Sequence, residues 1–125
     1  MLCGMQGAGK TTWTAAHSRG CTIRQSYTFQ ELREDLLRGR RVILDNEHLL
    51  SEQRIPLVRW ARKYRAEVVL VFFCVSRAAC ESRVPFAVYD FVAAEKLMRF
   101  ALQDVLTERW DQIIWIPMYS RKVFG

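Results

Sequence analysis

Residues 4–11 read Gly4-Met5-Gln6-Gly7-Ala8-Gly9-Lys10-Thr11 and fit the pattern G-x-x-x-x-G-K-[ST] at every fixed position. A short apolar run, residues 1–3, precedes this segment, and a helix is expected to follow it. Glycines let the backbone fold closely around an anion, so that several N–H groups and the start of the helix point at the same oxygens. The segment therefore predicts a phosphate-binding loop between a strand and a helix.

The residue types in this loop suggest a division of roles. Lys10 is expected to reach the β- and γ-phosphates of a nucleoside triphosphate, and the Thr11 hydroxyl is expected to bind Mg²⁺. The predicted contacts to the nucleotide are Gly4, Gln6, Gly7, Ala8, Gly9, Lys10, Thr11 and Thr12. We therefore expect ATP or GTP, together with Mg²⁺. A glycine-rich turn that merely opens a helix is the alternative, and the number of matched positions disfavours it.

An acidic residue closes a later apolar run. Residues 41–44 form a strand-like segment that ends in Asp45. Beside a phosphate-binding loop, an acid in this position holds Mg²⁺ directly or through water. We predict that Asp45 and Thr11 form the metal site and that Asp45 takes part in catalysis. An acid at the end of a strand can also simply cap the next helix.

Short apolar runs alternate with charged segments of helical periodicity. Strands are expected at 1–3, 21–23, 41–44, 68–75 and 113–116, and helices at 29–38, 51–64 and 89–106. Thr28 and Glu31 have the spacing of a capping box, and Gly39 is expected to end that helix. In the second helix, Pro56 suggests that the regular part starts near the proline. The alternation predicts one α/β domain, 1–125, of P-loop NTPase-like type: a three-layer sandwich with a mostly parallel sheet of about five strands.

The apolar positions of two helices predict their buried sides. Leu32, Leu36 and Leu37 fall on one face of the helix at 29–38. In the last helix, Val92, Leu97, Phe100 and Ala101 are expected to face the core.

Composition is that of a compact domain with anionic partners. The chain has 125 residues, half of them hydrophobic, and a formal charge of +6 dominated by arginine. Arginine suits phosphate recognition, although solvated helix faces explain such residues equally well. The four cysteines, Cys3, Cys21, Cys74 and Cys80, lack zinc-site spacing and are expected to be buried, reduced thiols. No signal peptide is evident and no apolar run approaches the ~20 residues of a membrane span, so we expect a cytoplasmic protein without a membrane partner.

From Asp45 onward the chain resembles the P-loop polynucleotide kinases, which phosphorylate 5′-hydroxyl ends of nucleic acids, and related small P-loop kinases. The similarity rests on the loop followed by Thr12-Trp13, on Val42-Ile43-Leu44-Asp45-Asn46, on a helix with Arg54 that ends Ala61-Arg62-Lys63-Tyr64, on the strand 68–73, on a short helix with Arg83, and on Trp110-Asp111-Gln112-Ile113-Ile114. It implies an ATP- and Mg²⁺-dependent kinase in which Lys10 and Thr11 contact phosphate and metal. Asp45 would lie next to the reacting centre, and Arg83 would belong to a lid over the γ-phosphate. Arg83 could equally face the carbonyl dipole at the end of its own helix.

The chain departs from that family at two places. These kinases usually place an aspartate, their general base, after the second strand, whereas residues 21–23 run here into Arg24-Gln25-Ser26-Tyr27 without an acid. Asp45 ranks first and Glu47 second as the base, and a site without a base is the third option. The lid is confined to residues 76–88 and has no second arginine after Arg83. A short lid predicts slow transfer or a partner that completes the site.

Three functions remain in view. The leading one is a polynucleotide 5′-hydroxyl kinase, because the short segment between Ile23 and Arg41 leaves little chain to enclose a small acceptor. A cationic surface near the acceptor is then expected from Arg24, Arg40, Arg41, Arg54, Arg59, Arg62 and Arg65, with Tyr27, Trp60 or Tyr64 stacking on a base. For Trp60, core packing is the favoured alternative. A small-molecule or nucleoside kinase would use the same loop and Asp45, and a non-catalytic NTP-binding module is the third function.

Overall fold

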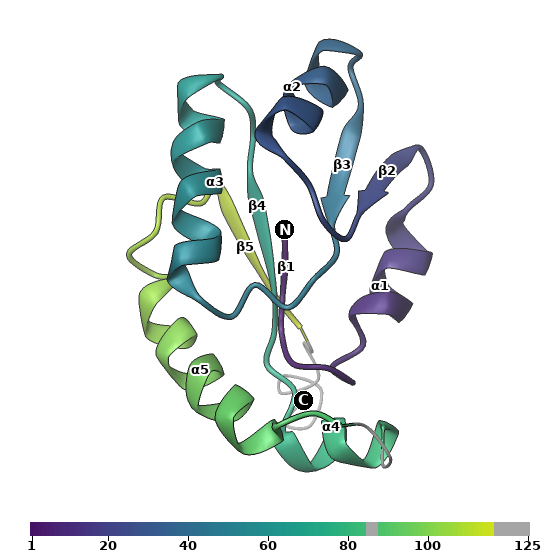
Figure 1. The fold of residues 1–125 in the computed structure, drawn as a ribbon, viewed down its shortest axis with the longest axis vertical. Coiled ribbons are helices and arrows are strands. Elements are labelled where there is room, and N and C mark those ends of the chain that lie inside the picture. Colours follow the sequence, from purple (N-terminus) through teal and green to yellow (C-terminus); the bar gives the residue numbers. More distant parts are fainter. Residues whose placement is uncertain (85–87, 117–125) are drawn as a thin grey trace, which may run out of the picture.

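The computed structural model describes residues 1–84 and 88–116, in which strands and helices alternate (Figure 1). The elements are β1 (Leu2–Cys3), α1 (Lys10–His17), β2 (Cys21–Arg24), α2 (Phe29–Leu37), β3 (Arg41–Leu44), α3 (Ser51–Lys63), β4 (Val69–Phe73), α4 (Arg77–Arg83), α5 (Phe91–Asp104) and β5 (Gln112–Ile116). All five expected strands are present within one or two residues of their predicted ends. The chain is therefore an α/β protein, as predicted.

The strands pair in parallel, but they form two hydrogen-bonded groups and not the single sheet that was expected. One group has the order β1-β4-β5 and the other consists of β2 and β3. The two groups are joined at the end next to the cleft, where the Gly4 N–H donates to the Glu47 carbonyl oxygen at 2.9 Å. Because β1 has only two residues, it is too short to pair along β3. A cavity of about 530 Å³ lies between the groups, bordered by side chains of α2, β3, α3 and β4.

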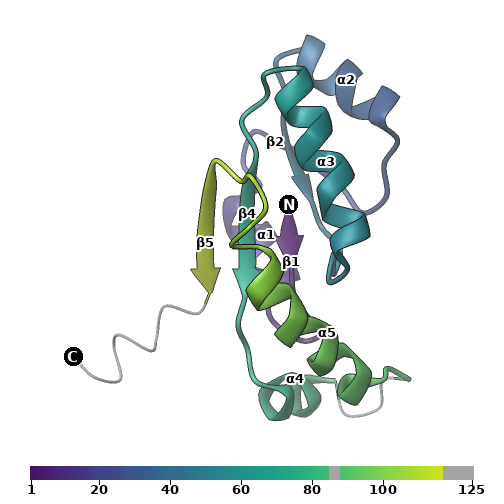
Figure 2. The same cartoon turned by 90° about the vertical axis from the view of Figure 1, so that its left-hand side faces the viewer.

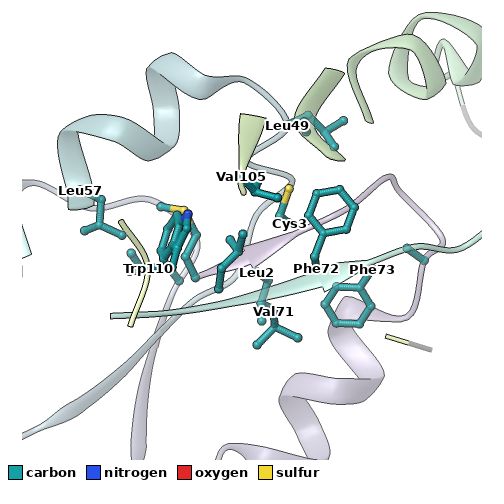
Figure 3. Packing of buried hydrophobic residues seen from close by; sticks show 14 of the residues in the cluster. Leu2, Cys3, Leu49, Leu57, Val71, Phe72, Phe73, Val105 and Trp110 are labelled. Atoms are coloured by element: carbon teal, nitrogen blue, oxygen red, sulfur yellow. The ribbon is translucent and has the colours of Figure 1, made fainter. Parts of the chain in front are cut away.

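Helices cover both faces of the strands. Figures 1 and 2 place α1 on one face and α2, α3 and α5 on the other. This is the arrangement that right-handed crossovers between parallel strands produce. The core centres on β4, where residues 70–73 are buried almost completely. Phe72 and Phe73 point to opposite faces of the strand (Figure 3), which explains why β4 is a continuous apolar run.

The predicted boundaries of α2 are confirmed by its capping groups. Thr28 Oγ1 accepts the Glu31 N–H at 3.1 Å, and Glu31 Oε1 accepts the Thr28 N–H at 2.9 Å. Gly39 follows the helix with a φ of +70°. The predicted start of α3 near Pro56 is wrong, since the helix begins at Ser51 and contains the proline. The N–H that Pro56 lacks would have faced the carbonyl of Glu52, which lies in the exposed first turn and can bind water instead.

The predicted buried sides of α2 and α5 are only partly correct. Leu32 is buried, but Leu37 is 76% exposed, and on α5 Phe100 is 66% exposed. Leu36 and Val92 are also exposed. The face that α5 does bury is lined by Ala94, Met98 and Ala101. Each helix therefore buries a narrower stripe than its apolar residues suggest.

All four cysteines are unbonded thiols, of which Cys3 and Cys80 are buried and Cys21 and Cys74 are half-buried. Burial raises the pKa of Cys3 to about 12, so its thiol stays protonated. Among the described residues, no helix has the length and apolar character needed to cross a membrane.

Candidate functional site

An open cleft of about 1040 Å³ lies at the carboxyl ends of β1, β3, β4 and β5. In open α/β sheets, ligands bind outside the carboxyl ends of the strands, where the strand order changes direction. The cleft is lined by residues of three segments that sequence analysis singled out, namely Gln6, Gly7, Ala8, Gly9, Lys10, Thr11 and Thr12 from the loop, Asp45 and Glu47 after β3, and Arg83 from α4. Gly4 is the exception, because it is buried against Phe73 beneath the loop.

The glycine loop, residues 4–11, lines the cleft with residues 6–11 and leads into α1. Gly7 and Gly9 have φ values of +82° and +99°, which only glycine adopts readily. Gly9 is the N-cap of α1, and it supplies no side chain to cap the first N–H groups of the helix. Its first turn also contains no acidic residue. These unoccupied donors and the helix dipole favour an anion at this point.

Lys10 lies across the inside of the loop. Its Nζ donates to the carbonyl oxygens of Gly4, at 2.8 Å, and of Met5, at 2.7 Å. Burial lowers the pKa of Lys10, and the nearby carboxylates of Glu47 and Asp45 act in the opposite direction. Lys10 is thus a positioned cation with two carboxylates close to it.

The acidic segment after β3 is held in place by its neighbours. The Asp45 N–H donates to the Arg24 carbonyl at 2.9 Å, which extends the pairing of β2 with β3. Asn46 Nδ2 donates to the Gln25 carbonyl at 3.1 Å. His48 then turns the chain with a φ of +46°, and its buried ring lies with Nδ1 2.7 Å from the Leu2 carbonyl. This histidine is a structural link between β1 and the acidic segment.

Tyr89, just before α5, contacts the cleft-lining residue Glu47 from a distant part of the sequence. Its hydroxyl donates to Glu47 Oε1. Burial, reinforced by this hydrogen bond, raises the pKa of Tyr89 well above its ordinary value, so it remains a donor at neutral pH. Asp45, in contrast, makes no side-chain hydrogen bond or ion pair with the rest of the described chain. Tyr89 carries no motif, and no spacing in the sequence connects it with Glu47.

Helix α4 places Arg83 over the glycine loop. Arg83 Nη1 donates to the Gly7 carbonyl at 2.9 Å. The helix packs so tightly there that a Cβ on Gly7 would lie 2.7 Å from the Cys80 carbonyl oxygen. Arg83 therefore contacts the loop while it also lies in the last turn of α4, where the alternative interpretation placed it. Residues 85–87 of the expected lid lie outside the described residues.

Four of the seven arginines expected to form a cationic surface near the acceptor are held in ion pairs, and the expectation is wrong for Arg54, which is fully buried. The guanidinium of Arg24 binds buried Asp35 at 2.7 Å and Glu31 at 2.8 Å, and Arg40 also contacts Asp35. Arg54 is fully buried against Glu108, and Arg62 pairs with Asp111. Buried carboxylates need a cationic partner, and Arg24 and Arg54 supply it to Asp35 and Glu108. Of the other three, Arg41 begins β3 and Arg65 precedes β4, so both lie at the end of the strands opposite to the cleft.

The described residues contain no group of three or more His, Cys, Asp or Glu side chains that could hold a metal ion by themselves. Comparison of the chain with models of known protein families and with curated proteins found no match.

Proposed function

We propose that this chain is a P-loop phosphotransferase that uses ATP and Mg²⁺ and transfers the γ-phosphate to the 5′-hydroxyl end of a polynucleotide. One observation carries the proposal: the glycine loop, Lys10 and the carboxylates of Asp45 and Glu47 line the same cleft. The loop motif is a property of eight consecutive residues, whereas the cleft is formed by the packing of strands that are distant in the sequence. Their coincidence supports a phosphate site more strongly than the motif alone.

The residues present fit a magnesium nucleotide. The uncapped start of α1 and the positioned Lys10 suit the phosphates. Mg²⁺ typically binds through one or two carboxylates together with substrate phosphates and water, so a site without an all-protein cage agrees with this ion. Thr11 and Asp45 would hold it. The ion would neutralise negative charge on the phosphate oxygens.

The chain's own groups then divide the remaining work. Lys10 and Arg83 would balance the charge that develops on the transferred group. Asp45 would accept the proton of the incoming hydroxyl, because its carboxylate is not engaged by another described side chain. Glu47 is a weaker candidate, since one of its oxygens already accepts a hydrogen bond from Tyr89.

The test measures the transfer of a radiolabelled γ-phosphate from ATP to candidate acceptor molecules. We expect label on 5′-hydroxyl oligonucleotides and none on nucleosides or common metabolites. Lys10→Ala and Asp45→Asn should each lower transfer by about 100-fold or more while the circular dichroism spectrum is retained. Lys96→Ala and Asp104→Asn, both on the exposed side of α5, are the matched controls and should transfer normally.

Each alternative function has its own outcome in this experiment. Label on a nucleoside but on no oligonucleotide would support a nucleoside kinase. Binding of ATP and Mg²⁺ by calorimetry without any transfer would support a non-catalytic NTP-binding module. Unchanged ATP affinity in folded Lys10→Ala would contradict the assignment of the phosphate loop itself.

A further inference from the structure

We infer that the surface between α2 and α3 is a binding track for single-stranded nucleic acid, whose bases stack on four aromatic rings. This aromatic seam consists of Tyr27, Phe29, Trp60 and Tyr64. The inference rests on the proposed function and adds to it the surface that holds the acceptor strand.

The four rings form a continuous series although they come from separate parts of the chain. The ring centroids of Tyr27 and Phe29 are 6.2 Å apart, those of Phe29 and Trp60 are 5.7 Å apart, and those of Trp60 and Tyr64 are 5.2 Å apart. Trp60 and Tyr64 are four residues apart on α3 and so share one side of the helix. Figure 2 shows α2 beside α3, which brings Phe29 to the same seam.

Core packing explains only the inner part of the seam. Tyr27 and Trp60 are half-buried and pack against the core. Phe29 and Tyr64, however, remain 40% and 45% exposed, as does Leu36 at 40% on the adjoining part of α2. Contiguous exposed apolar groups on a charged protein often mark a site of interaction. The outer rings are therefore available to a partner.

The seam begins at the rim of the cleft. Tyr27 follows two residues after Gln25, which lines the cleft. The Tyr27 ring also lies 6.5 Å from that of His48, the residue after Glu47. At its other end the seam reaches Tyr64, the C-cap of α3. A single-stranded nucleic acid whose 5′ end occupied the cleft could thus continue over the aromatic rings toward the opposite end of the β-strands.

Cations border the seam along its length. Arg33 lies one turn after Phe29 on α2, and exposed Arg59 and Lys63 flank Trp60 on α3. Lys63 Nζ lies 5.7 Å from the centroid of the Tyr64 ring. Of the acidic residues on α2, Glu31 and Asp35 are held in ion pairs, while Glu34 is exposed. An apolar strip with a cationic border has the two features that single-stranded nucleic acid requires, stacking surfaces for bases and positive charge for phosphates.

The experiment measures the affinity of the full chain for labelled oligo(dT) and oligo(rU) of about twelve nucleotides by fluorescence anisotropy. Phe29→Ala and Tyr64→Ala should each weaken binding about tenfold, and the double variant should weaken it further. Phe100→Ala is the control, because it removes an even more exposed aromatic ring from α5, away from the seam. It should bind within about twofold of the parent chain.

A second pair of variants tests the cationic border. Lys63→Gln should flatten the slope of log affinity against log salt by about 0.7, the value for one contact to a single-stranded phosphate. Lys96→Gln, on the exposed side of α5, should leave the slope unchanged. Unchanged unfolding curves and unchanged affinity for ATP would show that the seam variants are folded. The DNA and RNA probes distinguish which type of strand the seam prefers.

The outcomes separate this inference from the proposed reaction. Seam-dependent oligonucleotide binding without phosphate transfer would support the track and reject the kinase. Transfer to oligonucleotides with an unchanged KM in Phe29→Ala and Tyr64→Ala would support the kinase and overturn the track. The track would also be overturned by equal losses in Phe100→Ala, by no binding of either oligonucleotide at low salt, or by a dimer in sedimentation that Tyr64→Ala dissociates.

Discussion

Arg24 is held at the end of β2 by ion pairs with Asp35 and Glu31 on α2. It ends β2, where the resembling kinases continue into an aspartate that acts as base. Here its guanidinium turns to α2 and forms two hydrogen bonds with Asp35, at 2.7 and 3.1 Å. Asp35 is 1% exposed, so its charge depends on this partner. The end of β2 thus has a structural role, and the acids available to the cleft come from the segment after β3.

We predict that Asp35→Asn destabilises the protein by about 2 kcal/mol at neutral pH, because it removes charged hydrogen bonds from a buried position. The hydrogen bond from Arg24 holds the pKa of Asp35 below its ordinary value of 3.8. Since the folded pKa is the lower one, this stabilisation is complete above about pH 4 and disappears as the pH falls through the folded pKa. Urea unfolding at several pH values should therefore show the difference from the parent chain shrinking in acid. Glu34→Gln changes an exposed residue next to Asp35 and should leave the free energy of unfolding unchanged. If the loss of stability in Asp35→Asn stayed the same at every pH, the role of the ion pair would be contradicted.

Helix α4 packs closely against the backbone of the glycine loop at Gly7. Gly7→Ala places a methyl group 2.7 Å from the Cys80 carbonyl oxygen and also strains a positive φ. Gly20 has a similar φ of +75° but nothing within 4 Å of its Cβ position, so Gly20→Ala measures the backbone strain alone. We expect Gly20→Ala to lower the free energy of unfolding by about 1 kcal/mol and Gly7→Ala to lower it by clearly more. Equal unfolding free energies for the two variants would show that α4 moves freely away from the loop.

A buried ion pair connects α3 to the segment between α5 and β5. Arg54 forms two hydrogen bonds with Glu108, at 2.9 and 3.0 Å, and donates a third to the His48 carbonyl. We predict that Arg54→Ala costs about 3–5 kcal/mol, since it leaves Glu108 as an uncompensated buried charge. Replacing both residues, as Arg54→Met with Glu108→Leu, should recover most of that loss. Arg77→Ala breaks only exposed pairs and should cost less than about 1 kcal/mol in the same denaturant titration. A double variant as unstable as Arg54→Ala would show that the charges themselves are required.

At the scale of the whole molecule, two groups of strands share one end and are separated by a cavity at the other. Strand β4 is paired on both sides, whereas β2 and β3 form only a two-stranded ladder. Two-stranded ladders are marginally stable by themselves. We predict that amides of β2 and β3 exchange with solvent at least about tenfold faster than those of β4 in native-state hydrogen exchange. ATP with Mg²⁺ should slow the β3 amides in particular, because Asp45 follows β3 and the glycine loop follows β1. Equal protection in both groups would indicate one cooperative sheet.

Much of the fold can be read from the sequence because its signals are local. The apolar runs mark the five strands, since strands buried on both faces need continuous apolar residues. Thr28, Glu31 and Gly39 mark the ends of α2 through bonds that span only a few positions. The glycine loop is recognisable for the same reason, as its positive φ values and its helix start belong to eight consecutive residues. Lys10, Asp45 and Arg83 line one cleft, and their roles in binding and catalysis stay predictions.

Other features depend on which elements pack together. The burial of Arg54, the engagement of Arg24 by Asp35 and the contact of Tyr89 with Glu47 join residues that are 11 to 54 positions apart. The exposure of Leu37 and Phe100 likewise depends on where neighbouring elements end. The helical periodicity of their segments does not predict this exposure. Hydrogen-bonded caps and apolar periodicity are properties of short segments, and the sequence determines them. Side-chain partners across the fold depend on the relative positions of packed helices and strands, and only the tertiary structure decides those.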